Sequence, residues 1–406
     1  MSAVSAVVSA ILSRRLRGLE SGGLAVTFPD GRRVAYGDAT AAPVALHIDS
    51  WWFIWRVATG GDIGFAECFM RGEWRTDDLT ALIQLFADDR DAMGASSSDP
   101  SWPRRMFERW LHWTRRNTPQ GNRRNIAAHY DLGNEFFELF LDDSMTYSCG
   151  IFDSPETTLE QAQRCKIDAV IERAGVEHGD DVLEIGSGWG QLAMVLAREH
   201  ACQVTTITQS EEQAIYVRAL AHSEGLSDRI HVKLSDYRDI DGEYDRIVSV
   251  EMLEAVGHDN LSTYFEVCRR RLRAGGQAAI QVITIQDHLY DEYRTSSDFI
   301  RRYIFPGGHL PSLAALHEAI GGAGLEINYV TDIGPHYART LREWRDRFAA
   351  NADRLRAMSF DDRFQRTWEY YFAYCEAGFR AGMLGDLHIV LSRAADVATS
   401  RNRSAA

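Results

Sequence analysis

The chain has 406 residues, of which 45% are hydrophobic, and a formal net charge of −14. This length exceeds that of an ordinary single domain, so we expect two domains or one domain with a large extension. The acidic balance argues against a general nucleic-acid-binding protein. The sequence has no run of about 18 apolar residues, so it predicts no membrane-spanning helix.

The six cysteines show neither a CxxC pair nor the spacing of metal ligands, which favours a reducing compartment over a disulfide framework or a zinc site. The histidines form no HxxxH or HxH pair, so no metal centre is expected. The basic cluster Arg14–Arg17 follows the mildly apolar first residues, whereas a secretory signal begins with its basic residues. We therefore expect a cytoplasmic protein.

The first part of the chain, residues 1–96, predicts a small α+β module. Two stretches, Leu24–Phe28 and Arg33–Tyr36, flank the turn sequence Pro29-Asp-Gly31 and indicate a β-hairpin. Helices are predicted over Trp51–Ala58 and Asp77–Ala87, the second with Thr76 as its N-cap.

Residues 97–125 form a basic segment that connects this module to the rest of the chain. Between Trp102 and Arg124 there are seven arginines and one acid, Glu108. An apolar stripe at helical spacing consists of Trp102, Met106, Trp110 and Trp113. An amphipathic helix of this kind either anchors a protein on anionic lipid or packs its stripe between domains. The sequence leaves both interpretations open.

Residues 126–406 alternate between predicted strands and helices, which indicates an α/β fold with a doubly wound, mostly parallel sheet. The segment 286–375 is rich in Tyr, Phe and Arg and is too long for an ordinary connection. Long insertions at the carboxyl edge of such a sheet commonly build the substrate pocket, so we expect this segment to set specificity. Strands are predicted over residues 181–185, 203–207, 230–234, 244–250 and 277–284.

The segment Val182–Gly190 combines an apolar strand, an acid and three glycines within five residues. The glycines permit a tight turn and close approach of a ligand to the backbone before a helix begins near Gln191. Dinucleotide-binding proteins use the same device but place an acid about 20 residues further on. Here Val204–Ser210 carries no carboxylate, whereas Glu184 precedes the glycines and Asp236 follows the next strand. This order is typical of class I methyltransferases that use S-adenosylmethionine (SAM).

Six peptides, taken together and in order, extend this prediction to a family. The chain resembles the cyclopropane fatty acid synthase family, which transfers carbon from SAM to the double bond of an unsaturated acyl chain of a membrane phospholipid. The resemblance runs from about residue 20 to residue 395. The peptides are His129–Asn134, Met145–Cys149, Leu183–Gly190, Glu254–Gly257, Tyr303–Pro306 and Phe379-Arg380.

The resemblance implies a set of residues around SAM. Small residues and backbone amides would approach the methionyl part, and polar side chains would hold the ribose. Without the family, Thr208 and Gln213 also read as ordinary polar residues at a strand end and a helix start. The implied set is Tyr147, Ser148, Gly186, Gly188, Thr208, Gln209, Gln213, Asp236 and Tyr237.

For the reaction centre, the resemblance implies Cys149, Glu254, Tyr337 and Cys375. In that family a bicarbonate ion, held by polar residues and backbone, takes the proton that the substrate loses. Such a base is chemically necessary, because an alkene that attacks the SAM methyl group leaves a carbocation in a pocket that excludes water. The two cysteines can also be read as small buried apolar residues, and Glu254 as a surface acid.

The chain departs from the family at Gln281, where cyclopropane-forming members carry a histidine on the fifth strand. A glutamine can donate and accept hydrogen bonds but cannot take a proton near neutral pH. With its neighbouring peptides, Gln281 resembles the branch that makes methyl- or methylene-branched acyl chains of the tuberculostearic type. In that branch the cation loses a proton from a chain carbon instead of from the new methyl group, and no ring closes.

The sequence therefore predicts C-methylation of a phospholipid acyl double bond, with cyclopropane formation as the alternative. The enzyme would bind the inner face of the cell membrane peripherally through its N-terminal module. A homodimer and a partner reductase for a methylene product follow from the resemblance alone. The rival classes are a small-molecule N-methyltransferase and a non-catalytic lipid-binding protein, which membrane binding and lipid-dependent SAM turnover would distinguish.

Overall fold

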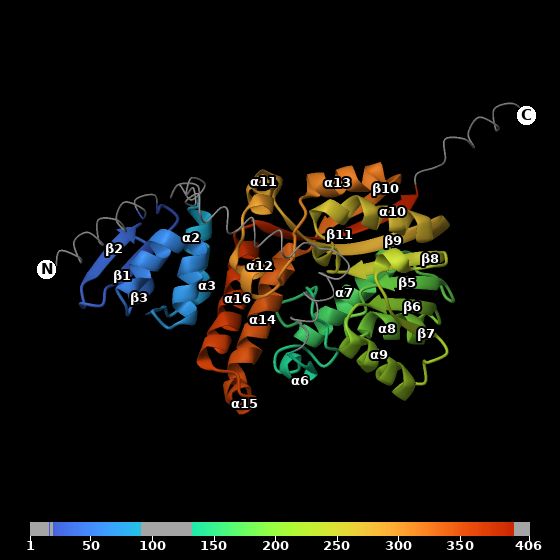
Figure 1. The fold of residues 1–406 in the computed structure, drawn as a ribbon, viewed down its shortest axis with the longest axis horizontal. Helices are drawn as coiled ribbons and strands as arrows, with labels where there is room; N and C mark the ends of the chain where they lie inside the picture. Colours follow the sequence, from blue (N-terminus) through green and yellow to red (C-terminus); the bar gives the residue numbers. More distant parts are fainter. Residues whose placement is uncertain (1–15, 17–18, 91–131, 394–406) are drawn as a thin grey trace, which may run out of the picture. The chain divides into compact units, whose positions relative to one another are not determined.

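The computed structural model describes Leu16, residues 19–90 and residues 132–393, and the chain divides into two compact units (Figure 1). The first unit joins the N-terminal residues to Thr295–Pro306 and Tyr337–Leu384. The second unit contains the described residues 132–294, Gly307–His336 and the residues from Gly385 onward. The predicted linker, residues 97–125, lies outside the described residues, so its helix and the domain limits at 96 and 125 stay predictions.

The first unit contains a four-stranded sheet in the order β2-β1-β3-β4. The predicted hairpin is confirmed, because β1 and β2 pair antiparallel; β3 then pairs parallel to β1, and β4 antiparallel to β3. The strands are β1 (Gly23–Thr27), β2 (Arg33–Gly37), β3 (Val44–Ile48) and β4 (Trp74–Arg75). The helices are α2 (Trp52–Met70), α3 (Leu79–Asp88), α12 (Phe299–Tyr303), most of α14 (Gly334–Ala350), α15 (Ala352–Ala357) and α16 (Asp362–Arg380).

Two local predictions in this unit were wrong. The N-cap of α3 is Asp78 rather than Thr76, because the Asp78 carboxylate accepts a hydrogen bond from Ala81 N at 2.9 Å. The predicted helix over residues 51–58 is only the first part of α2, which continues to Met70. Gly61 interrupts α2 with a non-helical backbone, and this break ended the helical signal in the sequence.

A buried carboxylate connects three helices of the first unit. Glu376 of α16 is fully buried, and its Oε2 accepts a hydrogen bond from Thr80 Oγ1 of α3 at 2.9 Å. The same oxygen lies 2.8 Å from Arg345 Nη1 of α14. Arg342 and Arg380 complete a cluster of three arginines around it. Removal of this carboxylate would leave its arginine and threonine partners uncompensated.

We expect Glu376→Ala to lower the free energy of unfolding by about 3 kcal/mol, because it breaks a buried ion-pair cluster. Urea-induced unfolding followed by circular dichroism measures the change. Asp353→Ala is the control, since the Asp353 side chain is 99% exposed and pairs only at the surface with Arg356. Equal stability of the two variants would contradict a stabilising role for the cluster.

The second unit is built on a seven-stranded sheet in the order β10-β11-β9-β8-β5-β6-β7. Strands β5 to β9 pair parallel wherever they are adjacent, and β10 pairs antiparallel to β11. This confirms the predicted doubly wound, mostly parallel sheet. The strands are β5 (Asp181–Ile185), β6 (Gln203–Thr208), β7 (Ile230–Leu234), β8 (Tyr244–Val250), β9 (Leu272–Ile285), β10 (Leu325–Asp332) and β11 (Leu384–Arg393).

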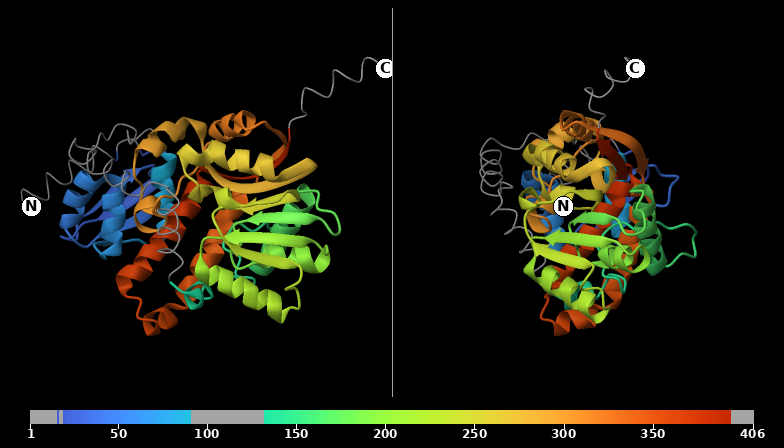
Figure 2. Two further views of the ribbon diagram at one scale, coloured as in Figure 1. Left: turned by 45° about the vertical axis from the view of Figure 1, so that its right-hand side comes forward. Right: turned by 90° about the vertical axis from the view of Figure 1, so that its right-hand side faces the viewer.

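Helices cover both faces of this sheet (Figure 2). One hydrophobic core contains side chains of α10 and α13, and the other contains side chains of α7, α8 and α9. The helices are α6 (Asn134–Phe137), α7 (Leu159–Arg173), α8 (Gln191–Glu199), α9 (Glu211–Ser223), α10 (Leu261–Arg271), α11 (Asp287–Thr295) and α13 (Leu313–Gly322). Single turns of 3-10 helix are η3 (Tyr237–Asp239), η4 (Leu253–Ala255) and η5 (His258–Asn260).

The strand predictions were close where the apolar run was local. The predictions for β5, β6, β7 and β8 agree with the structure to within one residue, and α8 begins at Gln191 as predicted. Strand β9 begins earlier than predicted, at Leu272, because its first residues include two glycines. Strand β10 lies inside the predicted insertion, and β11 follows it; neither was predicted. No helix in the described part of the chain is long and apolar enough to cross a bilayer.

Candidate active site

The glycine-rich turn after β5 has the backbone that its sequence requires. Gly186, Gly188 and Gly190 have φ values of +99°, +49° and +91°, which side chains disfavour. A Cβ atom at Gly190 would lie 2.8 Å from Val217 Cγ1, and one at Gly186 would lie 3.0 Å from Met252 Cγ. A Cβ atom at Gly188 would meet nothing within 4 Å, so the backbone faces open space there. A ligand can therefore approach the main chain at Gly188.

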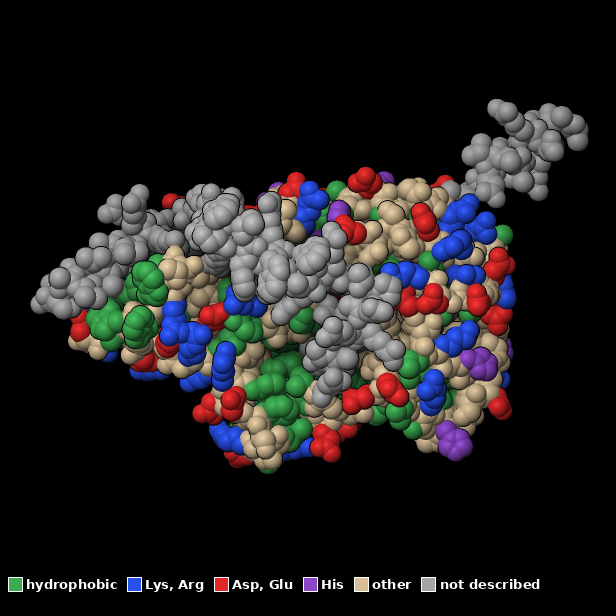
Figure 3. All heavy atoms as spheres, in the orientation of Figure 1, with side chains coloured by type: hydrophobic (Ala, Val, Ile, Leu, Met, Phe, Trp, Pro, Cys, Tyr) green, Lys and Arg blue, Asp and Glu red, His purple; other side chains and the backbone are tan. Residues whose placement is uncertain are grey.

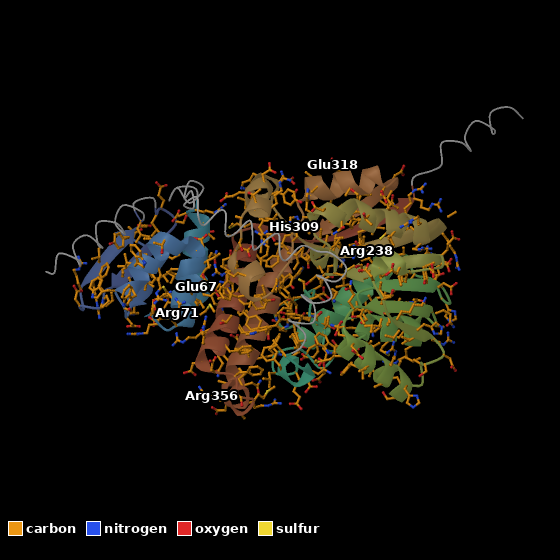
Figure 4. All side chains as sticks on the ribbon, viewed as in Figure 1. Glu67, Arg71, Arg238, His309, Glu318 and Arg356 are labelled. Atoms are coloured by element: carbon orange, nitrogen blue, oxygen red, sulfur yellow. The ribbon has the colours of Figure 1, made fainter. Side chains whose placement is uncertain are left out.

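Polar side chains follow the neighbouring strands β6 and β7. Thr208 Oγ1 donates to Gln213 Oε1 at 2.8 Å, and Gln209 Nε2 donates to Asp236 Oδ2 at 3.0 Å. Arg238, labelled in Figure 4, forms an ion pair with Asp236 at 2.7 Å. Burial raises the pKa of Asp236, but the hydrogen bonds from Arg238 outweigh it and hold the pKa below its usual value. This edge of the sheet thus presents a fixed carboxylate and two amides.

The other predicted SAM residues also lie in the second unit. The Tyr147 ring packs against Phe137 with centroids 5.5 Å apart. Ser148 Oγ accepts a hydrogen bond from the buried Lys166 Nζ at 2.7 Å. Burial raises the pKa of Tyr237 to about 12, so its hydroxyl stays neutral. All nine predicted SAM residues therefore lie in one unit, and all except Tyr147 and Ser148 lie at or after the carboxyl ends of β5, β6 and β7.

Glu184, the acid before the glycines, is buried and joins two strands. Its Oε2 accepts a hydrogen bond from Thr206 Oγ1 at 2.5 Å, across the parallel pair of β5 and β6. Burial raises the pKa of Glu184 to about 8, although this hydrogen bond and the charge of Lys166 act against burial. The side chain therefore connects β5 to β6 directly before the glycine-rich turn.

Three of the predicted reaction-centre residues meet around an acid that the sequence reasoning missed, Glu251. The backbone N–H of Cys149 donates to Glu251 Oε1 at 2.8 Å, and Gln281 Nε2 donates to the same oxygen at 2.8 Å. Glu254 lies in the following turn, and its Oε1 accepts a hydrogen bond from Ile283 N at 2.6 Å. Burial, and after it the charge of Glu251, raise the pKa of Glu254 to about 8.

The amide of Gln281 is oriented by a chain of hydrogen bonds. Burial lowers the pKa of His388 to about 3, so its ring is neutral. Arg173 can only donate to His388 Nδ1, so the proton of the ring is on Nε2, which donates to Gln281 Oε1 at 3.0 Å. Gln281 Nε2 is then left to donate to Glu251 and, at 2.8 Å, to Asp386 Oδ2. Gln281 thus acts as a hydrogen-bond donor at the centre of this cluster.

Sequence reasoning missed Glu251, Asp386, His388 and Lys166. Glu251 directly follows β8, and an acid at the carboxyl end of a parallel strand is a local signal that could have identified it. Asp386 and His388 lie on β11, which was not predicted. Lys166 lies on α7 and shows no local signal beyond an ordinary helical position.

The other two predicted residues, Tyr337 and Cys375, belong to the first compact unit. Tyr337 of α14 is buried and stacks on Phe379 with centroids 4.6 Å apart. Cys375 lies in α16, and burial, followed by the charge of Asp298, raises the pKa of its thiol. A thiol with a raised pKa stays protonated, so Cys375 is no nucleophile at neutral pH.

A bicarbonate ion, which the family resemblance implies, does not fit the donors of this cluster. The Cys149 N–H and the Gln281 amide both donate to Glu251, and the Ile283 N–H donates to Glu254. In the described part of the chain these three donors are thus directed to existing carboxylates, and a further anion beside a carboxylate is unfavourable in a buried site. Among the residues that the structure describes, no group of three potential ligands could hold a metal ion.

The parallel sheet and the glycine turn, with polar side chains on the next two strand ends, define a class I SAM-dependent methyltransferase. A family model described as mycolic acid cyclopropane synthetase matches residues 117–389, and the chain belongs to this family. The chain is 39% identical to the tuberculostearic acid methyltransferase UfaA1 of Mycobacterium tuberculosis, over 94% of this chain and 90% of that protein. It is 34% identical to cyclopropane mycolic acid synthase 1 of the same species, over 64% of this chain and 93% of that protein.

Solved structures agree with this assignment. The cyclopropane synthase MmaA2 from Mycobacterium tuberculosis superposes with a TM-score of 0.63 at 28% identity, over 67% of this chain and 98% of that chain. The mycolic acid cyclopropane synthase CmaA1, complexed with SAH and CTAB, superposes with a TM-score of 0.62 at 31% identity, over 66% of this chain and 97% of that chain. The protein is thus an enzyme that uses SAM as methyl donor.

We expect Asp236→Ala to weaken SAM binding roughly 10- to 100-fold, because a hydrogen bond to a charged group contributes about 1.5–3 kcal/mol. Isothermal titration calorimetry with SAM measures the change in Kd. Asp239→Ala, an exposed acid three residues further on, is the matched control and should bind SAM like the wild type. Unchanged affinity in Asp236→Ala would remove this carboxylate from the SAM site.

Proposed function

We propose that this enzyme methylates a double-bond carbon of an unsaturated fatty acyl chain in a membrane phospholipid, and that its product is methyl- or methylene-branched rather than a cyclopropane. The observation that carries the choice of product is Gln281. Its amide is held between His388 and Glu251 and cannot take a proton. The name of the 39% identical relative, a tuberculostearic acid methyltransferase, supports the same product class.

SAM supplies an electrophilic methyl group, and the chain supplies the surroundings in which an alkene can attack it. Gly186 and Gly188 bring the backbone to the ligand, and Asp236 orients it from the neighbouring strand end. Cys149, Glu254 and Gln281 are assigned to the reaction centre beside the carboxyl end of β8. Cys149 and Gln281 are buried, and a buried environment limits access of the water that would otherwise trap the cation on the acyl chain. The reaction-centre roles of Tyr337 and Cys375 stay predictions.

The substrate lies in a bilayer, so the enzyme must bind a membrane surface. Trp52 and Trp55 of α2 are each 65% exposed, although tryptophan is usually buried. On the face seen in Figure 3, hydrophobic and basic side chains lie beside one another on the first unit. Tryptophan with nearby basic residues suits the interface of an anionic membrane. We therefore assign the N-terminal unit to peripheral binding at the inner face of the cell membrane.

Two further partners follow from the proposed chemistry and family. Methyl transfer supplies no hydride, so a methylene product needs a separate reductase to become a saturated methyl branch. A homodimer remains a prediction from the family.

Lipids of a host rich in monounsaturated phospholipid, expressing this chain with methyl-labelled SAM, test the reaction. We expect a gain of one labelled carbon per modified acyl chain, and fragmentation by mass spectrometry should locate an exocyclic methylene or a methyl branch. The Asp236→Ala variant is the control for SAM dependence. A labelled ring would favour the cyclopropane alternative, and no labelled lipid despite SAM binding would favour a small-molecule methyltransferase.

The double variant Trp52→Ser/Trp55→Ser tests membrane docking. We expect its affinity for anionic vesicles to fall at least tenfold, because burial of each tryptophan contributes about 1.5–3 kcal/mol. Vesicle co-sedimentation measures the change. Ile215→Ser removes a comparably exposed apolar side chain from α9 of the second unit and should leave binding unchanged. Similar binding of all three proteins would exclude this docking surface.

A further inference from the structure

Glu251 occupies a backbone conformation that a side chain disfavours. Its φ is +47°, in the left-handed region, which residues other than glycine disfavour. The residue directly follows β8, and its N–H donates to Gln281 O of β9 at 2.9 Å. Strain of this kind is found where the surrounding structure and the function require a particular side-chain position. The question is therefore what the Glu251 carboxylate does in this position.

The strained backbone directs the carboxylate into a set of donors that could bind an anion. Glu251 Oε1 accepts hydrogen bonds from Cys149 N and from Gln281 Nε2, both at 2.8 Å. Lys166 is buried and close enough to interact with it electrostatically; burial lowers the pKa of Lys166, and the charge of Glu251 acts against this lowering. Two donors and a nearby cation stabilise the charged form of a carboxylic acid. An external anion would compete for the same donors.

The carboxylate also lies next to the SAM loop. Met252, the residue after Glu251, approaches Gly186 so closely that a Cβ atom there would lie 3.0 Å from its Cγ. Glu251 is partly exposed, whereas Asp386, which accepts from the same Gln281 nitrogen and interacts with the Glu251 carboxyl group, is fully buried. Glu251 thus combines partial exposure with two hydrogen-bond donors to one oxygen.

The other two acids of the cluster are suited to a neutral state. Burial, and after it the charges of Glu251 and Glu254, raise the pKa of Asp386 well above its usual value. Burial likewise raises the pKa of Glu254 to about 8. The raised pKa values favour the protonated form of both groups, which makes them weaker candidates for the proton acceptor than a carboxylate held by two hydrogen-bond donors.

We propose that Glu251 is the proton acceptor of the methyl-transfer reaction, a base built into the chain that takes the place of a bound bicarbonate ion. This inference rests on the proposed function. The alkene electron pair forms a C–C bond to the methyl group as the S–CH₃ bond breaks, which leaves S-adenosylhomocysteine and a carbocation on the acyl chain. Glu251 then removes a proton from a carbon adjacent to the cationic centre, and the C–H electron pair becomes a new double bond. Loss from a chain carbon gives a methyl-branched alkene. An exocyclic methylene forms when a 1,2-hydride shift first moves the cationic centre to the methylated carbon and Glu251 then takes a proton from the new methyl group. The carboxylic acid returns its proton to solvent after product release.

Purified full-length enzyme and vesicles of a monounsaturated phospholipid, with methyl-labelled SAM and a CO₂-free buffer, test this role. The wild type should transfer label at the same rate with and without added bicarbonate. Glu251→Gln keeps the shape and an acceptor oxygen, and it should lower kcat by ~10²–10⁴-fold while SAM binding is retained. Glu266→Gln, at an exposed position of α10, is the control. Wild-type activity that requires bicarbonate, or a Glu251→Gln variant within threefold of the wild type, would overturn the proposal.

Glu251→Gly separates a missing base from a misfolded site. Glycine relieves the positive φ and vacates the donors of Cys149 and Gln281, so this variant should fold, bind SAM and bind ¹³C-bicarbonate, detected by NMR. Added bicarbonate should restore part of its activity. Bicarbonate binding by the wild type would overturn the proposal, and this readout needs no lipid substrate. If the wild type instead excludes bicarbonate, Glu251→Gly binds it, and neither labels lipid, then Glu251 fills the anion position but both the proposed lipid reaction and its base role fail.

Discussion

The Glu251 carboxylate lies at the carboxyl end of β8, where a charge is tolerated only if donors surround it. Its donors come from distant parts of the chain: Cys149 from the segment before α7, and Gln281 from β9. Lys166 adds a buried positive charge from α7. Because each group depends on the others for compensation, the sheet and the helices on its faces must assemble correctly before the reaction centre exists. The fold of this unit and the assembly of the proposed site therefore depend on the same interactions.

The same compensation decides which groups can exchange protons. Hydrogen bonds from two donors favour the charged form of a carboxylic acid, and burial together with the charge of Glu251 raises the pKa of Glu254 and Asp386. His388 donates to the side-chain oxygen of Gln281 and so fixes the orientation of the amide. The amide nitrogen is then left to donate to Glu251. A histidine at position 281 would instead add a group that titrates. In the proposed mechanism, the choice between a branched and a cyclised product thus depends on which groups beside β8 and β9 can accept a proton.

The local elements were predictable because their signals lie in contiguous residues. The strand β5, the glycine turn and the start of α8 follow from the segment Val182–Gln191, and the hairpin of β1 and β2 follows from its turn sequence. Errors arose at helix ends, where neighbouring residues compete to begin or end the helix. Asp78 rather than Thr76 caps α3, and α2 continues beyond the break at Gly61 to Met70.

The class of enzyme could be predicted from the sequence, because the glycine turn and the acids around it form a SAM signature within short segments. The family peptides then extended this prediction from the class to the family. The sequence also determined that Gln281 cannot be a base. Only the tertiary structure decided what Gln281 contacts, because Asp386 and His388 lie more than 100 residues away on β11. It also revealed that the Glu251 carboxylate accepts hydrogen bonds from Cys149 and Gln281. The positive φ of Glu251 and the positions of its hydrogen-bond donors are properties of the folded chain, and the pattern of residue types along the sequence does not encode them.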